Sequence, residues 1–410
     1  MSCNLFFTFS QENELSLSKA IELALEENYG IIISKSNVEI ASRNNTWGNA
    51  GRFPILDFSS SATFSSSGNS NQSSLRTGIG LSWTLFNGFK VNVTKNKLNE
   101  LEELSGGNSM VVIENTIQDI VLSYYNILLQ REKLLVLEKV MMLSKDRYEY
   151  EELKRELGGT VTYNVLQAKN NFLSDKSSYL NQEVVVRNGI RNLNFLLGEE
   201  TSRLWVITEE FQADTSDYII SNLLDKMLAN NQQLQNQYTN LVLMKNEIEL
   251  RKSTLYPRIG LSSDVFNNYN MTSGNSDLNF TNRLDLTYDI YTGGTRQLAI
   301  VVAKIQEEIE MVETEQMKHS LTNLLLNEYD LYNIRKTLLN VAIENLEAAE
   351  LNLQIADEKF RTGAINSFNY RDIQLIYLNA ALQKIQSVYN LIDSHTMLTR
   401  LTGGYINPQE

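Results

Sequence analysis

The sequence predicts a mainly α-helical protein with a small β part, built from two tandem copies of one unit. Two stretches of about 60 residues carry apolar side chains at alternating steps of four and three residues, the spacing of long helices that pack lengthwise. Only 3 of the 410 residues are proline, so these helices are expected to run uninterrupted. Features of several kinds recur after about 205 residues, which indicates the second copy.

The longest helix is predicted at residues 92–156. Its apolar stripe includes Ile120, Tyr124 and Ile127. At about 1.5 Å per residue, some 60 helical residues would reach roughly 90 Å, which is longer than a globular domain needs. One stripe cannot bury itself, so this helix must pack along others. Gly106-Gly107 is the weak point of the prediction, because each glycine costs about 1 kcal/mol inside a helix.

The second copy of this helix is predicted at residues 296–360. When 205 is added to each number, Ile120, Tyr124 and Ile127 become Leu325, Tyr329 and Tyr332. Any two heptad helices can be slid into such a match, so features of other types are needed. Gly363 follows Gly158 after 205 residues, and Pro257 follows Pro54 after 203. Unrelated features that share nearly one offset indicate a tandem duplication.

The predicted organisation has four parts: a residual signal-peptide segment at 1–14, a first repeat at 15–203, a second repeat at 204–404 and a tail at 405–410. The first repeat contains a helix that runs to about Gly51, a strand pair at 55–86 and long helices at 92–156 and 163–197. The second contains a helix, a strand pair at 259–291 and long helices at 296–360 and 366–402. Residues 5–13 pass from apolar to polar like the end of a signal peptide, so we expect the natural start to lie upstream. The alternative is a disordered terminus.

The second and fourth predicted strands alternate apolar and polar residues, strictly so in the second, and the first strand does so more weakly. Leu81 and Trp83 lie on the apolar face of the second strand, and Leu284, Leu286 and Tyr288 lie on that of the fourth. The predicted strands of about 11–13 residues exceed the usual globular length of about 5–6. They are close to the roughly 9–11 residues of a tilted strand that crosses a bilayer.

Glycines mark the turns between the long helices. Gly158 and Gly159 follow the first long helix, and Thr362 and Gly363 follow its copy. Glycine adopts the left-handed conformation that ends helices, so each repeat is predicted to form a helical hairpin with an exposed tip.

Composition and motifs exclude several classes of function. A net charge of −13 argues against a nucleic-acid partner, which requires a basic face. One cysteine excludes a disulfide framework, and the two histidines, His319 and His395, are interpreted as ordinary helix residues. Phosphate loops, nucleophile elbows and clustered metal ligands are missing from the sequence, so we expect no enzyme activity, catalytic residue, cofactor or metal. The mean hydropathy is −0.27, and no apolar run approaches 18 residues.

The strands suggest a membrane channel made by several copies. Four strands cannot close a barrel, and an open sheet edge in lipid leaves backbone groups unpaired. Three copies would supply 12 strands, with the apolar face toward lipid and the polar face toward water. A soluble β-sandwich is disfavoured, because two isolated hairpins have no obvious partner sheet within the chain. A soluble structural coiled-coil scaffold remains the alternative; it explains the helices but not the duplicated strands.

A family resemblance rests on features in a fixed order: Asn28 at a helix end, Pro54 and Pro257 before strands, Phe86-Asn87-Gly88 and Tyr291-Thr292-Gly293-Gly294 after strands, and the tip motifs Gly158…Val165-Leu166-Gln167-Ala168 and Phe360-Arg361-Thr362-Gly363. Over residues 15–404 the chain resembles the TolC family of outer-membrane efflux channels. The resemblance implies a homotrimer with a 12-stranded β-barrel in outer-membrane lipid and an α-helical barrel forming a periplasmic tunnel. It also implies docking onto a periplasmic adaptor (membrane fusion) protein, linked to an inner-membrane pump of RND, ABC or MFS type or to type I secretion.

The resemblance also implies a gate at the periplasmic mouth, where the family carries aspartates soon after the second tip glycine. Asp372 matches one such position, and Asn369 stands at the other. Phe360 and Ile365 replace the family's tyrosine and arginine gate pair, so we expect hydrophobic closure by these two residues. The alternative is that Asp372 is an ordinary solvated helix residue.

Adaptor docking is expected at the exposed tips, with Gly158, Gly159, Thr362 and Gly363 as the docking residues. The family's glycine-containing tip motif is matched here. The alternative is that these glycines only make the turns.

Overall fold

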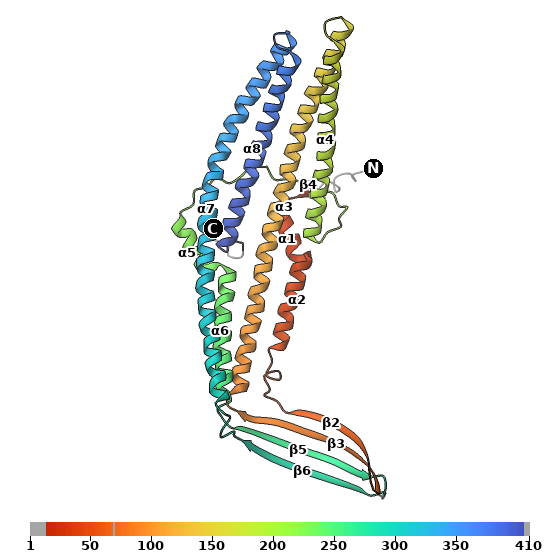
Figure 1. Cartoon of the computed structure of the whole chain (residues 1–410), viewed down its shortest axis with the longest axis vertical. Helices are drawn as coiled ribbons and strands as arrows, with labels where there is room; N and C mark the ends of the chain where they lie inside the picture. The colour runs from red at the N-terminus through yellow and green to blue at the C-terminus, as the bar shows by residue number, and fades with distance from the viewer. Residues whose placement is uncertain (1–13, 69, 406–410) are drawn as a thin grey trace, which may run out of the picture. The chain divides into compact units, whose positions relative to one another are not determined.

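The computed structural model describes residues 14–68 and 70–405 (Figure 1). The elements are β1 (Glu14–Leu15), α1 (Leu17–Glu27), α2 (Tyr29–Asn44), β2 (Ile55–Ser67), β3 (Ser70–Asn87), α3 (Lys90–Glu156), α4 (Thr162–Leu197), β4 (Val206–Ile207), α5 (Ile220–Asn230), α6 (Gln232–Ser253), β5 (Arg258–Asn270), β6 (Ser276–Thr287), α7 (Thr295–Arg361) and α8 (Ser367–Leu401). Almost all of the predicted signal-peptide segment and of the tail lies outside the described residues.

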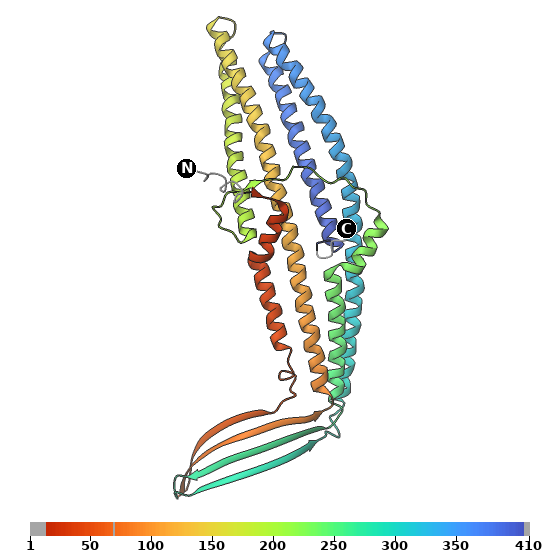
Figure 2. The ribbon, with the colours of Figure 1, turned by 180° about the vertical axis from the view of Figure 1, so that it is seen from behind.

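The described chain forms two compact units, each made of parts from both halves of the sequence. One comprises the described residues of Met1–Ile33, Met110–Asn231 and His319–Glu410 and contains both helical hairpins. The other comprises Ser34–Ser109 and Gln232–Lys318 and contains the four long strands. Figure 2 shows these strands lying side by side.

The long helices repeat with the predicted spacing. α3 and α7 each have 67 residues, and their first residues, Lys90 and Thr295, are 205 apart. The hydroxyl of Tyr124 donates to the carbonyl of Leu15 at 2.8 Å, and that of Tyr329 donates to the carbonyl of Tyr218 at 3.3 Å. Equivalent tyrosines in the two repeats therefore make equivalent hydrogen bonds.

The first helix of each copy is broken where one helix was predicted. α1 ends at Asn28, whose extended backbone interrupts the helix, and α2 ends at Asn44 rather than near Gly51. The Asn28 side chain accepts from the Ile31 N–H at 3.1 Å and donates to the Leu196 carbonyl at 2.7 Å. It thus caps the start of α2 and satisfies a carbonyl at the end of α4.

The same junction occurs in the second copy. Asn231 ends α5 with the same extended backbone, and its side-chain amide donates to the Leu401 carbonyl near the end of α8 at 3.1 Å. An asparagine therefore breaks the first helix of both copies for the same reason.

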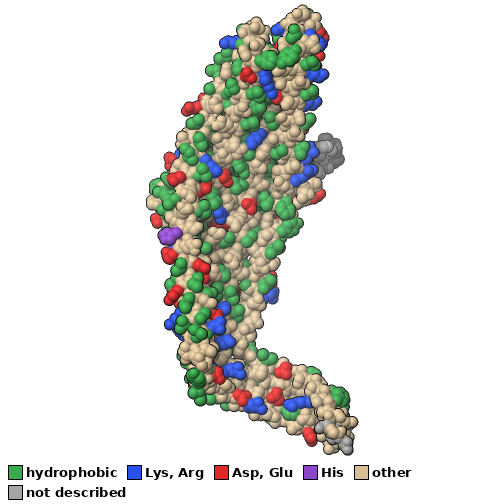
Figure 3. Space-filling view, viewed as in Figure 1, with side chains coloured by type: hydrophobic (Ala, Val, Ile, Leu, Met, Phe, Trp, Pro, Cys, Tyr) green, Lys and Arg blue, Asp and Glu red, His purple; other side chains and the backbone are tan. Residues whose placement is uncertain are grey.

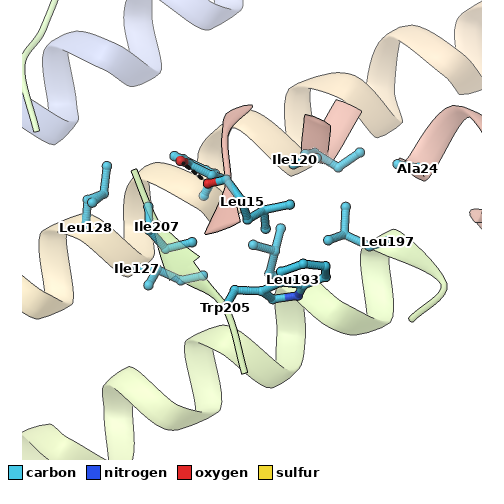
Figure 4. Packing of buried hydrophobic residues seen from close by; sticks show 11 residues of the cluster. Leu15, Ala24, Ile120, Ile127, Leu128, Leu193, Leu197, Trp205 and Ile207 are labelled. Atoms are coloured by element: carbon cyan, nitrogen blue, oxygen red, sulfur yellow. Dashed lines mark hydrogen bonds between the residues drawn. The ribbon is translucent and has the colours of Figure 1, made fainter. Parts of the chain in front are cut away.

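The apolar stripe of α3 fills a core, as Figure 4 shows. Ile120, Tyr124 and Ile127 are fully buried there, which agrees with the predicted stripe. Their neighbours are Leu128 on α3 itself, Ala20 and Ala24 on α1, Leu193 and Leu197 on α4, Leu15 and Ile207 in the short parallel pair of β1 and β4, and Trp205 just before β4. The Trp205 indole donates to the side-chain oxygen of Asn194 at 2.7 Å, so its polar atom is satisfied inside the core.

α3 continues through Gly106-Gly107, the weak point of the prediction. A Cβ at Gly107 would lie 1.9 Å from the end of the Asn236 side chain on α6. A glycine here therefore lets the side chains of α6 lie close to α3, although glycine is a poor helix former. Among the described residues, no helix is both long enough and apolar enough to cross a membrane.

The two strand pairs join into one antiparallel sheet in the order β2-β3-β5-β6. The prediction of isolated hairpins was wrong, because β3 pairs with β5 from Ser74 opposite Asn270 to Asn87 opposite Arg258. β6 ends at Thr287, so Tyr288 lies just beyond the strand in which it was predicted. The reason is that Thr287 faces Arg258, the first residue of β5, so later residues have no partner on that strand.

Replacing Gly198 by alanine is expected to destabilise the protein more than replacing Gly158. Both glycines have left-handed backbone, with φ of 73° and 77°, so alanine costs about 1–2 kcal/mol at either site. At Gly198 the new Cβ would also lie 2.3 Å from the Glu27 carbonyl oxygen, whereas at Gly158 it meets nothing within 4 Å. Thermal unfolding of the two purified variants measures the difference, and equal losses would contradict the close packing of α4 against α1.

Candidate functional site

One face of the four-stranded sheet carries most of its large apolar side chains. The row of Phe58, Ile79, Val265 and Phe280 is apolar from edge to edge, whereas Ser60, Thr77 and Asn267 form a polar row on the same face. In an antiparallel sheet, residues directly opposite each other point to the same face. Leu56 lies opposite Leu81, and Leu261 lies opposite both Trp83 and Leu284. Large side chains exposed on this face are Leu56, Phe58, Phe64, Ile79, Trp83, Val265, Tyr269, Leu278, Phe280, Leu284 and Leu286. Four of the predicted strand residues, Leu81, Trp83, Leu284 and Leu286, thus share one surface.

The opposite face is polar and charged. Asp57, Gly80, Asp264 and Thr281 form one row across all four strands. A Cβ at Gly80 would lie 2.9 Å and 3.1 Å from carboxylate oxygens of Asp264 and Asp57, so glycine makes room for both acids. Charged side chains are visible on the sheet in Figure 3. The sheet therefore separates an apolar surface from a polar one.

The helical hairpins end in two exposed tips, at the upper ends of α3–α4 and α7–α8 in Figure 1. Gly158 and Gly363 have φ of 77° and 75°, as their predicted role in the turns requires. The backbone N–H of Gly159 donates to the Lys154 carbonyl at 2.8 Å, and the Thr362 hydroxyl donates to the Glu358 carbonyl at 3.1 Å. All four predicted tip residues therefore lie in the turns or directly beside them.

The predicted gate residues lie on both sides of the second tip. Phe360 is 6% exposed and stacks on Tyr370, with ring centroids 4.7 Å apart. Ile365 is partly buried against the same cluster. Asn369 and Asp372 are exposed on α8. Phe360 and Asp372 line two different cavities, so the structure does not bring these two residues together within one chain.

A buried ion pair near the tips was missed by sequence reasoning. Arg371 on α8 donates to both carboxylate oxygens of Asp175 on α4, at 2.7 Å and 2.8 Å. Their side chains are 15% and 9% exposed. The Ser144 hydroxyl on α3 also donates to Asp175. The pair links the two hairpins of one chain, and its two residues are 196 positions apart. A pattern among neighbouring residues therefore cannot predict it.

Sequence comparison supports the predicted family. Residues 223–404 match the family model described as outer membrane efflux protein. The second half of the chain is therefore similar to this family. No protein with curated function matches the chain in sequence.

Solved structures of outer-membrane channels share the fold. The CmeC outer membrane channel of Campylobacter jejuni aligns with a TM-score of 0.77 at 16% identity, covering 95% of this chain and 85% of CmeC. VceC of Vibrio cholerae gives 0.77 at 15%, covering 94% and 96%. The open-state MtrE channel of Neisseria gonorrhoeae gives 0.74 at 16%, covering 94% and 88%. The predicted class, a duplicated, mainly helical fold like that of TolC with a small sheet, is confirmed.

Removing the acid of the buried pair is expected to destabilise the hairpins strongly. Asp175→Asn leaves the Arg371 guanidinium buried without its counter-charge, a change that costs about 3–5 kcal/mol in comparable cases. Glu39→Gln is the matched control, because the Arg43–Glu39 pair is exposed and such pairs contribute about 0–1 kcal/mol. Chemical unfolding measures both. Similar midpoints for the two variants would show that the buried pair does not stabilise the fold.

Proposed function

We propose that three copies of this chain form an outer-membrane channel whose helical tunnel lies in the periplasm. It would be the exit duct of a tripartite efflux pump or of a type I secretion system. The observation that carries the proposal is the exposed apolar face of the sheet. Leu286, for example, is 69% exposed, although a soluble protein would bury such a row of side chains.

The sheet of one chain has two open edges, and closing it into a barrel requires several copies of the chain rather than one. Within the chain, the outer strands β2 and β6 each pair with one neighbour. In lipid, their remaining backbone groups need partners, which β2 of one copy and β6 of the next can supply to each other. Three copies then give a 12-stranded barrel, with the apolar face toward outer-membrane lipid and the row through Asp57 and Asp264 toward water. In this proposal each repeat, 15–203 and 204–404, contributes one strand pair and one hairpin.

Exposed stripes on the hairpin helices support contacts between copies. Leu166, Leu173 and Leu180 recur every seven residues on α4, and each is about half exposed. Ile334 and Val341 are spaced in the same way on α7. Heptad stripes pack against other helices, so neighbouring copies are expected to cover them and form the α-helical barrel.

We assign adaptor docking to the two tips, because they are the free ends of both hairpins. Exposed apolar side chains beside the glycines, Leu157 and Val161, offer a contact surface. The adaptor would link the channel to an inner-membrane pump of RND, ABC or MFS type. Adaptor capture that is unchanged by Gly159→Trp and Gly363→Trp would leave these glycines as turn residues only.

The mass of the protein extracted with detergent from the outer-membrane fraction tests the channel proposal directly. We expect an outer-membrane protein with three times the 46.8 kDa of one chain, after subtraction of the detergent. Light scattering combined with size-exclusion chromatography measures this mass. A monomer or dimer that is stable without detergent would contradict the channel and favour a coiled-coil scaffold.

The acid proposed at the periplasmic mouth is expected to govern conductance. Three copies would place three Asp372 carboxylates in one narrow opening, where their field attracts cations. Asp372→Asn should therefore lower cation selectivity in planar-bilayer recordings of the trimer. Asn369→Gln, an uncharged change on the same helix, is the control. Equal selectivity in all three proteins would contradict the ring.

In the same recordings, Ile365→Glu tests hydrophobic closure at the mouth. A charge at this partly buried position should raise the leak conductance of the closed channel. Phe360 is assigned to the same closure, but it is packed in the core and is a poorer probe, because a charge there would also disturb folding.

A further inference from the structure

A small cavity of about 120 Å³ lies at the start of both α4 and α8. Its walls include Asn164 in the first turn of α4 and Ser367, the first residue of α8. Helix N-termini direct free N–H groups and the positive end of the helix dipole toward such a space. α4 begins without a side-chain cap at Val161. With about 30 Å³ per water molecule in the liquid, the cavity has room for an oxyanion of a few heavy atoms.

Arg147 of α3 lines this cavity and carries an unpaired charge. It is 2% exposed, and its Nη1 donates to the Ser367 carbonyl at 3.3 Å, while Nε and Nη2 are buried without a partner. Among the described residues, no carboxylate lies within ion-pair distance of it. Burial and the neighbouring Arg371 lower the pKa of Arg147 to about 10, against the opposing effects of Asp175, Tyr370 and Glu151.

Other charges lie near Arg147 without forming an ion pair with it. Asp175 and Glu151 attract its charge, and Arg147 also lines a second cavity with Asp146, Glu149 and Asp357. Arg371 also lines the cavity, but Asp175 neutralises it through two hydrogen bonds. Glu151, one turn from Arg147 on α3, is buried with one carboxylate oxygen unpartnered, and it does not line the cavity. Among the described residues of the wall, Asp372 is the one carboxylate, and its side chain is exposed.

We infer that this cavity binds a small oxyanion, with the Arg147 guanidinium and the starts of α4 and α8 as its positive groups. Guanidinium matches two oxygens of a phosphate or carboxylate with parallel N–H groups, and Arg147 has Nε and Nη2 free for this purpose. Asp372 lies in the same wall and opposes an anion by repulsion. The site is made by one chain, so it does not depend on the proposed trimer.

Calorimetric titration of the purified full-length protein with inorganic phosphate, at constant ionic strength in chloride, tests the site. Wild type is expected to bind phosphate, and Arg147→Met should bind about tenfold more weakly or worse, because a charge-assisted bidentate contact is lost. Arg131→Met is the control, since Arg131 is an exposed arginine on the same helix. Asp372→Asn should bind more tightly than wild type.

Two outcomes would contradict the proposed oxyanion site. The first is the absence of phosphate binding by the wild-type protein. The second is the same affinity in wild type, Arg147→Met and Asp372→Asn, which would show an adventitious ion only. If Arg147→Met fails to fold, Asp372→Asn decides, because its side chain is exposed and its expected effect is a gain of affinity.

Discussion

The pairing of β3 with β5 is the interaction on which the sheet depends. A two-stranded hairpin is marginally stable in water, and each half of this chain supplies only one. The β3–β5 ladder joins them and fixes their register, which places Ile79 opposite Val265 and Trp83 opposite Leu261. A shift of one residue would move every apolar side chain of one pair to the polar face. The separation of apolar and polar surfaces therefore rests on this one ladder.

The hairpins have two kinds of interior. Around Tyr124 the core is apolar, and its few polar atoms are satisfied, as at Trp205 and Asn194. Toward the tips, Asp175 and Arg147 are buried and the side chain of Arg371 is 15% exposed. Arg147 lines one cavity with the stacked rings of Phe360 and Tyr370. Burial of apolar area drives folding without directional preference, whereas a bidentate ion pair has one geometry. The ion pair of Arg371 and Asp175 therefore also constrains how the two hairpins align.

The sequence alone was sufficient for the features that repeat along the chain. The stripe through Ile120, Tyr124 and Ile127, the alternation at Leu81 and Trp83, and the glycines of the tips all follow from local periodicity or backbone conformation. These signals depend on near neighbours in the chain, so one sequence suffices to detect them.

What the sequence did not show depends on residues far apart in the chain. The joining of the two hairpins requires the register between β3 and β5, and the hydrogen bond from Asn28 to the Leu196 carbonyl requires the end of α4. Arg147, Asp175 and Arg371 were missed because each resembles an ordinary helical charge until three helices are assembled. Of the gate and tip residues, the glycines in the turns could be predicted from the sequence. Their left-handed backbone conformation is a property of the single residue and does not depend on distant parts of the chain.

The two hairpin tips differ in how the helix that follows each turn is capped. α8 starts with Asn366, whose side chain accepts from the Asn369 N–H at 2.9 Å, whereas α4 starts with Val161, which makes no such bond. A side-chain cap contributes about 1 kcal/mol to the end of a helix. The first turn of α4 should therefore fray more readily than that of α8, and amide hydrogens there should exchange faster. Two tips of common ancestry would then differ in rigidity, one adaptable and the other preorganised.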